Sequence, residues 1–270
     1  MTHPEPPRTG RAARIARGAI AHYEDPLYYD AAYRRRKSDV RFYREVAQEY
    51  GGPILELGVG TGRVALDLVK AGHEVTGVDC SKAMLSHARS KAERLPKQAQ
   101  RRLSLRKSDL RTVRLPTRFR LVIAPFNVFM HLYTLRDVER TLATARRHLS
   151  PRGRLVFDVI NPDLRVMSRT PDRLYRARKV RTASTGDVSA YYEAFEYDAV
   201  RQVQMTSLIF QRAHSSDLSI VPLSQRQFFP QELSALLHYN GFAVERCWGD
   251  FERGPLDSAS ESQVWIARAR

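Results

Sequence analysis

The sequence contains little cysteine and no long apolar run. Its two cysteines, Cys80 and Cys247, stand far apart without Cys-x-x-Cys spacing, so they indicate neither a thiolate metal site nor an oxidising compartment. Residues 1–18 contain proline and arginine where a secretory signal is continuously apolar, and no later segment reaches the roughly 18 apolar residues of a membrane span. We therefore expect a soluble, cytoplasmic protein with no membrane partner.

Lysine is also scarce, although the chain is strongly basic. The net charge is +16, and only seven of the 45 Lys+Arg residues are lysine. A basic balance is typical of proteins that bind nucleic acid. An arginine bias of this kind, however, also arises in a GC-rich genome without functional cause. We interpret the charge mainly as composition, and a substrate bearing phosphate or carboxylate is the alternative.

The length and composition predict an ordinary globular protein of the size of an enzyme. With 270 residues, 43% hydrophobic and 27% charged, the chain can bury a substantial core as one large or two small domains. Residues 23–50 are aromatic and basic, with the spacing of one or two helices. After them, strand and helix patterns alternate: strand 54–57, helix 64–69, strand 73–79, helix 81–95, strands 103–106 and 119–126, helix 135–148, a turn at 151–153 and strand 154–160.

This alternation predicts an α/β fold with a Rossmann-like, mostly parallel sheet covered by helices on both faces. A helix at 231–239 and strands at 242–248 and 262–269 complete seven strands. Between the strand at 154–160 and the helix at 231–239, the segments 191–198 and 202–212 alternate like an antiparallel hairpin with its turn at 199–201. We divide the chain into a basic flexible arm (1–22), lid helices and core (23–162), an antiparallel β insertion (163–229) and the end of the core (230–270).

The insertion is expected to cap the substrate site or to contact a second subunit. Arg176, Arg178 and Arg181 alternate along it and are candidates to bind an anionic group, although solvated charges on a strand are the commoner explanation. Whether the protein is a monomer or a homodimer stays open.

A glycine-rich loop follows the first strand of the core. Glu56-Leu57-Gly58-Val59-Gly60-Thr61-Gly62 stands at a strand-to-helix turn, where nucleotide cofactors bind. A dinucleotide fingerprint needs a third glycine at position 63, which is Arg63, so a nicotinamide dehydrogenase is disfavoured. Asp79 ends the second strand about 20 residues after the loop, where a ribose-binding carboxylate is expected. Asp109 follows the third strand, where it could meet an adenine edge.

With these motifs the chain resembles a class I S-adenosylmethionine-dependent methyltransferase, from about residue 28 to the C-terminus and most densely over 55–109 and 127–162. The resemblance implies that Glu56, Gly58, Gly60 and Gly62 lie near the methionine part of the cofactor, that Asp79 binds ribose, and that Asp109 binds the adenine amine. Met84 would pack on adenine. The alternatives are that Met84 is an ordinary core residue and that Asp109 caps a helix. The other cofactor contacts that we expect are Tyr29, Tyr33, Arg63, Cys80, Leu110 and Phe126.

The segment after the fourth strand, 126–132, is expected at the reaction centre, because ligands of such sheets bind beyond the carboxyl ends of the strands. His131 is the candidate general base, since an acceptor amine must lose a proton before it attacks. Asn127 is the candidate for positioning the acceptor. The segment resembles small-molecule N-methyltransferases that act on amino sugars and glycine. His131 as a helix cap or a satisfied buried histidine is the alternative.

A second segment also resembles that group. Tyr29-Asp30-Ala31-Ala32-Tyr33 is similar to its lid helix, in which a tyrosine hydroxyl approaches the cofactor. Either tyrosine could instead be an ordinary packing residue of an amphipathic helix.

We therefore predict methyl transfer from S-adenosylmethionine to a small molecule, on nitrogen in preference to oxygen. A nucleic-acid methyltransferase is one alternative, favoured by the charge and by the basic segment 8–17. Against it, Ala124-Pro125-Phe126-Asn127 lacks the Asn/Asp-Pro-Pro-aromatic signature of enzymes that methylate base amines. A cofactor-binding accessory protein without catalysis is the other alternative.

Overall fold

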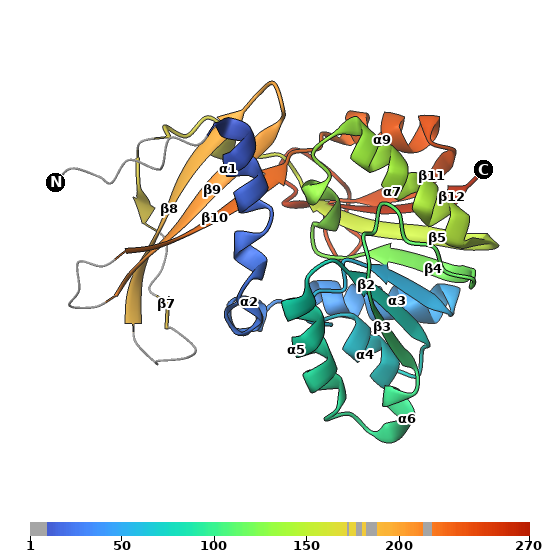
Figure 1. Cartoon of the computed structure of the whole chain (residues 1–270). Helices are drawn as coiled ribbons and strands as arrows, with labels where there is room; N and C mark the ends of the chain where they lie inside the picture. The colour runs from blue at the N-terminus through green and yellow to red at the C-terminus, as the bar shows by residue number, and fades with distance from the viewer. Residues whose placement is uncertain (1–9, 172, 177–179, 182–187, 213–217) are drawn as a thin grey trace. The chain divides into compact units, whose positions relative to one another are not determined.

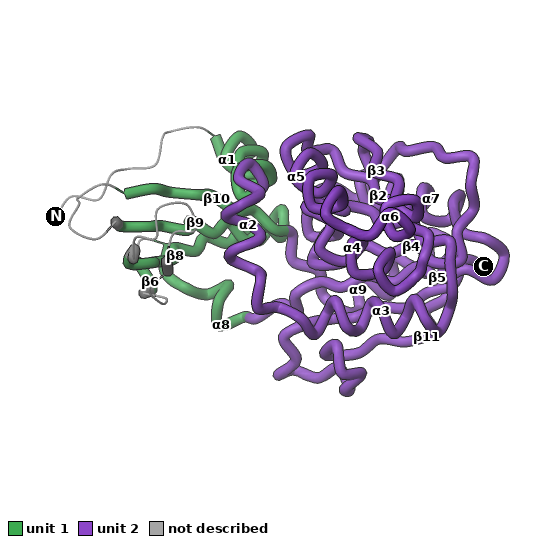
Figure 2. Tube along the Cα trace, turned by 90° about the horizontal axis from the view of Figure 1, so that it is seen from below, with its two compact units in different colours: residues 1–22, 164–225 green, residues 23–163, 226–270 purple. Residues whose placement is uncertain are grey.

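The computed structural model describes residues 10–171, 173–176, 180–181, 188–212 and 218–270 (Figure 1). The chain folds as two compact units, which Figure 2 distinguishes by colour. Unit 1 comprises residues 1–22 and 164–225, and unit 2 comprises Tyr23–Asp163 and Arg226–Arg270. Among the described residues, no helix combines the length and the apolar character needed to cross a bilayer.

Unit 2 is built on a seven-stranded sheet, which confirms the predicted α/β class. Its strand order is β11-β12-β5-β4-β1-β2-β3. β12 runs antiparallel to both of its neighbours, and the other pairings are parallel. The strands are β1 (Ile54–Leu57), β2 (Val75–Asp79), β3 (Leu103–Lys107), β4 (Phe119–Ala124), β5 (Leu149–Ile160), β11 (Phe242–Trp248) and β12 (Ser262–Ala269).

Helices cover both faces of this sheet (Figure 1). β1 alternates between the two faces, so Leu55 and Leu57 join one buried cluster and Ile54 joins the other. The first cluster includes side chains of α7 and α9, and the second includes side chains of α3 and α4. The helices of unit 2 are α2 (Pro26–Tyr33), α3 (Ser38–Tyr50), α4 (Ala65–Lys70), α5 (Lys82–Ala92), α6 (Lys97–Gln100), the 3-10 turn η2 (Val128–His131), α7 (Leu135–His148) and α9 (Pro230–Tyr239).

Four strand ends in unit 2 differ from the sequence prediction, since β2 begins at Val75 and β3 ends at Lys107, and the ends of β4 and β5 also differ. β4 stops at Ala124, because Phe126 and Asn127 have positive φ angles that a strand does not allow. β5 begins at Leu149, before the predicted turn at 151–153. Leu149 pairs with Phe119 and Arg154 pairs with Leu121, so the extra residues form a bulge within the strand.

Unit 1 contains the predicted antiparallel hairpin, formed by β8 (Val188–Asp198) and β9 (Val203–Arg212). Its sheet has the order β10-β9-β8-β6, and β7 also pairs with β8. We did not predict β10 (Leu218–Arg226), because Pro222 interrupts its pattern. A proline is tolerated there because β10 lies at the sheet edge. The remaining elements are β6 (Tyr175–Arg176), β7 (Val180–Arg181) and α8 (Leu164–Met167).

Residues 11–18 form the helix α1 (Arg11–Gly18), followed by the 3-10 turn η1 (Ala21–Tyr23). This differs from the prediction of a flexible arm over residues 1–22. Arg14 donates to Glu196 of β8 at 2.7 Å, and a Cβ added to Gly18 would lie 2.1 Å from Ser224 Oγ. Contact with the sheet of unit 1 therefore supports a helix that its own sequence pattern does not predict.

Candidate cofactor and acceptor site

The glycine loop joins β1 to α4. The strand order reverses at β1, because β2 and β3 lie on one side of it and β4 and β5 lie on the other. The N–H groups of Gly58 and Val59 both donate to Val78 O, at 2.9 and 3.0 Å, which ties the loop to β2. Gly58 has a φ of +71°, and a Cβ added there would lie 2.6 Å from Val128 Cγ2. Only glycine suits this position, where the loop passes close to η2.

Asp79 lies at the end of β2 and is connected to the same loop. Its Oδ2 accepts from Gly60 N at 2.8 Å, and its Oδ1 accepts from Ser81 N at 2.8 Å. Burial raises the pKa of this carboxyl, and the backbone N–H groups oppose the effect. Each carboxylate oxygen can accept a further hydrogen bond. The side chain of Cys80, the next residue, is exposed.

Glu56 is a buried carboxyl group at the start of the loop. The residue is 2% exposed, and its Oε2 has no hydrogen-bond partner among the described residues. Burial raises its pKa to about 8, although the nearby Arg63 guanidinium favours the ionised form. A buried acceptor without a partner is costly and marks a candidate ligand contact.

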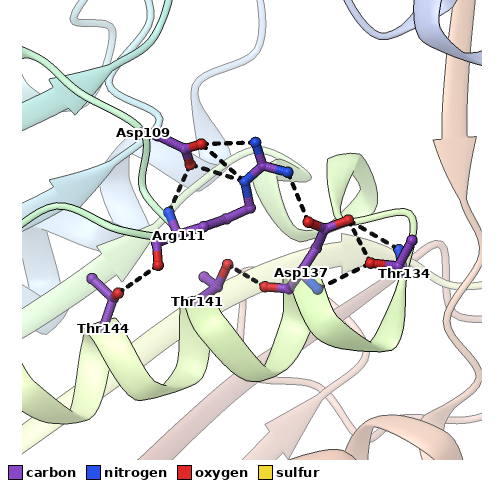
Figure 3. Close-up of polar contacts among 6 residues, drawn as sticks. All are labelled: Asp109, Arg111, Thr134, Asp137, Thr141 and Thr144. Carbon is purple, nitrogen blue, oxygen red and sulfur yellow. Dashed lines mark hydrogen bonds and ion pairs between the residues drawn. The ribbon is translucent and has the colours of Figure 1, made fainter.

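The residues predicted to contact adenine differ in burial, since Met84 and Leu110 pack in or against the core and Asp109 is in a partly exposed ion pair. Met84 on α5 is 1% exposed, and Leu110 packs against the core cluster of β1, β4 and β5. The Asp109 carboxylate accepts from Arg111 Nη2 at 2.7 Å, and Arg111 Nη1 donates to Asp137 Oδ1 at 2.7 Å (Figure 3). Asp109 therefore connects the loop after β3 to the first turn of α7.

A strained turn follows β4. Phe126 and Asn127 are consecutive non-glycine residues with φ angles of 64° and 66°, a conformation that costs free energy for side chains other than glycine. Asp158 on β5 accepts from both of their N–H groups, at 2.8 and 3.2 Å, and from Tyr43 Oη at 2.6 Å. Burial raises the pKa of Asp158 to about 6. This carboxylate compensates the strain by satisfying both backbone donors.

The predicted lid residues pack on this turn. The ring centroids of Tyr33 and Phe126 are 4.7 Å apart, and those of Tyr29 and Tyr33 are 4.9 Å apart. The Arg63 guanidinium lies 4.6 Å from the Phe126 ring and is paired with the buried Asp39 carboxylate. Arg36 lies 5.2 Å from the same ring.

Six of the thirteen predicted cofactor residues line one small cavity, namely Tyr29, Glu56, Gly58, Gly60, Arg63 and Phe126. Its volume of about 20 Å³ is close to the space that one water molecule needs. The cavity is lined by Tyr29, Glu56, Gly58, Val59, Gly60, Thr61, Arg63, Val64, Pro125 and Phe126.

His131, the candidate base, ends η2 and lies between two tyrosines. Its Nε2 is 2.6 Å from Tyr23 Oη, and its Nδ1 is 3.3 Å from Tyr133 Oη. Burial raises the pKa of Tyr23 well above its usual value, with a smaller effect from Tyr29. Tyr23 is therefore a neutral phenol that can donate to the imidazole.

Sequence reasoning did not single out Tyr23 or Asp158. Asp158 has a signal in the sequence, since it is the one charged residue in the apolar stretch 155–160. Tyr23 has none, because its partner is 108 positions away. Of the arginines predicted to bind an anion, Arg178 lies outside the described residues, as do the side chains of Arg176 and Arg181. The described residues hold no group of three or more His, Cys, Asp and Glu side chains placed to bind a metal ion.

Residues 54–153 match the family model of a methyltransferase domain. The chain is 28% identical over 219 residues to YqeM of Bacillus subtilis, a protein named as a methyltransferase, covering 80% of this chain and 84% of YqeM. It is 28% identical over 254 residues to glycine/sarcosine N-methyltransferase of Aphanothece halophytica, covering 93% of this chain and 88% of that enzyme.

Solved structures share the fold. The CcbJ methyltransferase of Streptomyces caelestis matches with a TM-score of 0.74 at 28% identity, over 86% of this chain and 96% of CcbJ. The glycopeptide N-methyltransferase MtfA, solved with S-adenosylmethionine, matches in fold with a TM-score of 0.60 at 20% identity, over 86% and 94% of the two chains.

These findings confirm the predicted class. Residues 54–153 are similar to a methyltransferase domain, and the fold of the chain is the one that solved S-adenosylmethionine-dependent methyltransferases share.

Proposed function

We propose that this protein transfers a methyl group from S-adenosylmethionine to an amine nitrogen of a small molecule, with His131 as the general base. The observation that carries the proposal is the 2.6 Å contact between His131 Nε2 and Tyr23 Oη, close in the chain to the strained turn after β4. The likeness to a glycine/sarcosine N-methyltransferase over nearly the whole chain supports an amine acceptor.

The residues around the loop fit the cofactor. Glu56 offers a buried carboxyl oxygen without a partner among the described residues. A cationic ammonium group such as that of the methionine part would favour the ionised form and displace the proton that burial holds on this carboxyl. The loop backbone at Gly58 and Gly60 can approach a ligand closely because both residues lack a side chain. The cofactor supplies an electrophilic methyl group on a sulfonium.

Asp79 is the proposed ribose ligand. Its two oxygens each accept one backbone hydrogen bond and retain capacity for a hydroxyl. At the adenine end we propose Cys80, Met84, Asp109 and Leu110. The Asp109 carboxylate must then serve the adenine amine while Arg111 holds it.

The aromatic residues exclude water and orient the reactants. Tyr29, Tyr33 and Phe126 form one cluster beside the loop, and aromatic faces attract cationic groups such as a sulfonium. Asn127 is buried beside this cluster and is the proposed positioning group for the acceptor. Alignment and exclusion of water are the main contributions that a protein makes to such a displacement.

His131 supplies the base. An acceptor ammonium has no free lone pair and cannot attack the methyl carbon. In our proposal its proton passes to Tyr23 Oη while the Tyr23 proton passes to His131 Nε2, which leaves a neutral amine and an imidazolium. The amine lone pair then forms the new nitrogen–carbon bond as the sulfur–carbon bond breaks.

The test is the pH dependence of turnover in His131→Ala and Tyr23→Phe. We expect turnover of His131→Ala to fall by about 10²- to 10⁴-fold at neutral pH. The deficit should shrink as the pH rises towards the pKa of the acceptor, because the free amine no longer needs a base. Cofactor affinity, measured by calorimetry, should stay unchanged.

Tyr23→Phe should resemble His131→Ala, whereas Tyr133→Phe, the matched control at the longer contact, should lose far less. Full turnover of His131→Ala across the pH range would show that the residue is not the base.

A further inference from the structure

Asp30, the second residue of the Tyr29–Tyr33 motif, has no part in the chemistry proposed above. Its carboxylate lies among donors from two other segments. Oδ1 accepts from Thr61 Oγ1 at 2.6 Å, and Oδ2 accepts from Lys91 Nζ at 2.7 Å and lies 2.9 Å from His87 Nε2. Thr61 belongs to the glycine loop, and the other two donors lie one turn apart on α5. A single carboxylate thus ties α2 to both.

These contacts favour an ionised Asp30. Burial alone would raise its pKa, but the hydrogen bonds from Lys91, Thr61 and His87 more than offset burial and lower it. Thr61 is 1% exposed, and the side chains of Asp30, His87 and Lys91 are each between 22% and 28% exposed. The group is therefore partly shielded from water, where charge-assisted hydrogen bonds are strong. We call Asp30, Thr61, His87 and Lys91 the Asp30 cluster.

The Asp30 cluster connects the loop and α5 to the helix whose aromatic residues pack beside the loop. α2 carries Tyr29, which lines the cavity beside Glu56, and Tyr33, which packs on Phe126. The cavity has a volume of about 20 Å³ and is lined by Tyr29 and Phe126, so the position of α2 affects the room that a ligand has beside the loop. Moving α2 away from the loop breaks the contacts of Asp30.

We propose that Asp30 is a positioning residue that fastens α2 over the glycine loop and thereby sets the rate of cofactor release. The inference rests on the proposed function for the place of the cofactor, but not for the acceptor or the base. The contacts come from both the loop and α5, so loss of Asp30 frees α2 from both at once.

The test measures the dissociation rate constant of S-adenosylhomocysteine, by stopped-flow competition with excess S-adenosylmethionine and no acceptor present. We expect Asp30→Ala to speed dissociation by at least about tenfold, the effect of losing a charge-assisted hydrogen bond. The control is Asp25→Ala on the same helix. Asp25 caps α2 by accepting from Leu27 N and Tyr28 N, so its loss weakens the helix without touching the Asp30 cluster.

Asp25→Ala should leave the dissociation rate within about threefold of the wild type, although it lowers the melting temperature through loss of a cap. Asp30→Lys should release the product quickly, and adding Lys91→Asp should slow release again, because the exchange restores an opposite-charge pair. A purely structural role would not give this rescue. Equal dissociation rates in the wild type and Asp30→Ala, or equal acceleration by Asp25→Ala, would overturn the proposal.

A second measurement separates this proposal from the proposed function. Amide hydrogen exchange of residues 26–33 in the protein without ligand should be faster in Asp30→Ala and in Lys91→Ala than in the wild type. Unchanged exchange would contradict the role of Asp30 even if the cofactor binds. Absence of any methylated amine would count against the proposed acceptor and leave both results on Asp30 interpretable.

Discussion

Glu56 illustrates at the residue scale how a buried acid lowers the stability of the folded protein. Its carboxyl has a raised pKa of about 8, mainly through burial, against an ordinary value of 4.5. Between these values the folded protein keeps a proton that the unfolded chain has released. Folding stability therefore falls as the pH rises through this window, by up to about 1.4 kcal/mol per pH unit from this group alone.

Glu56→Gln should remove this pH dependence. The difference in free energy of unfolding between the variant and the wild type should move in favour of the variant as the pH rises from about 5 to about 8, and then level off. Urea unfolding at several pH values measures it. The same variant should bind S-adenosylmethionine more weakly by calorimetry, since the anionic partner of the ammonium is lost. A difference that stays constant with pH would mean that Glu56 is not buried as a proton-holding acid.

At the scale of elements, the turn after β4 depends on the neighbouring strand β5. Asp158 satisfies the N–H groups of Phe126 and Asn127, and it is itself held by Tyr43 on α3. Three elements therefore cooperate to keep two residues in a conformation that they disfavour. The turn places Asn127 and leads into the short helix that ends at His131.

Asp158→Asn should destabilise the protein by about 2–4 kcal/mol, because the two backbone N–H groups donate to different oxygens of Asp158 and one of these becomes an NH2 group, which cannot accept. Turnover should fall as well, since the acceptor side of the site loses its support. Tyr43→Phe is the matched control, because it removes one donor and leaves the backbone contacts in place, at a cost of about 1–2 kcal/mol. Chemical denaturation and steady-state kinetics measure both. Equal effects of the two variants would show that the turn does not depend on Asp158.

The sequence predicted elements with local signals and missed contacts between distant residues. Glycines, alternating apolar runs and a helix cap sufficed for β1, β2, α5 and α7, because periodicity and turn chemistry are local. β10 was missed because its proline resembles a strand breaker. α1 was missed because the sheet of unit 1 supports it.

The same division holds for the candidate site. The glycine loop, Asp79 and His131 could be located from motif spacing. The partners Tyr23 of His131 and Asp158 of the turn could not, because only the fold brings them together. Asp30 lies within the Tyr29–Tyr33 motif, yet nothing in that motif reveals contacts with α5.

At the scale of the whole molecule, several arginines take part in ion pairs. Arg11 and Arg14 pair with Glu196, and Arg111 pairs with both Asp109 and Asp137. Two arginines of the basic segment 8–17, which favoured a nucleic-acid partner, therefore form ion pairs within unit 1. This supports the interpretation of the charge as composition. The role of residues 163–229 as a substrate cap or a dimer contact stays a prediction, as does the cytoplasmic location.

The most direct measurement is a methyl-transfer assay read by mass. Purified protein is first titrated with S-adenosylmethionine, S-adenosylhomocysteine and NAD by calorimetry, and then incubated with S-adenosylmethionine and matched panels of amines, phenols and RNA. We predict binding of the two adenosyl ligands, no binding of NAD, and a gain of one methyl mass on an amine, with neither phenols nor RNA modified. Methylation of RNA or phenols alone, or binding of NAD in place of the adenosyl ligands, would contradict the proposed function.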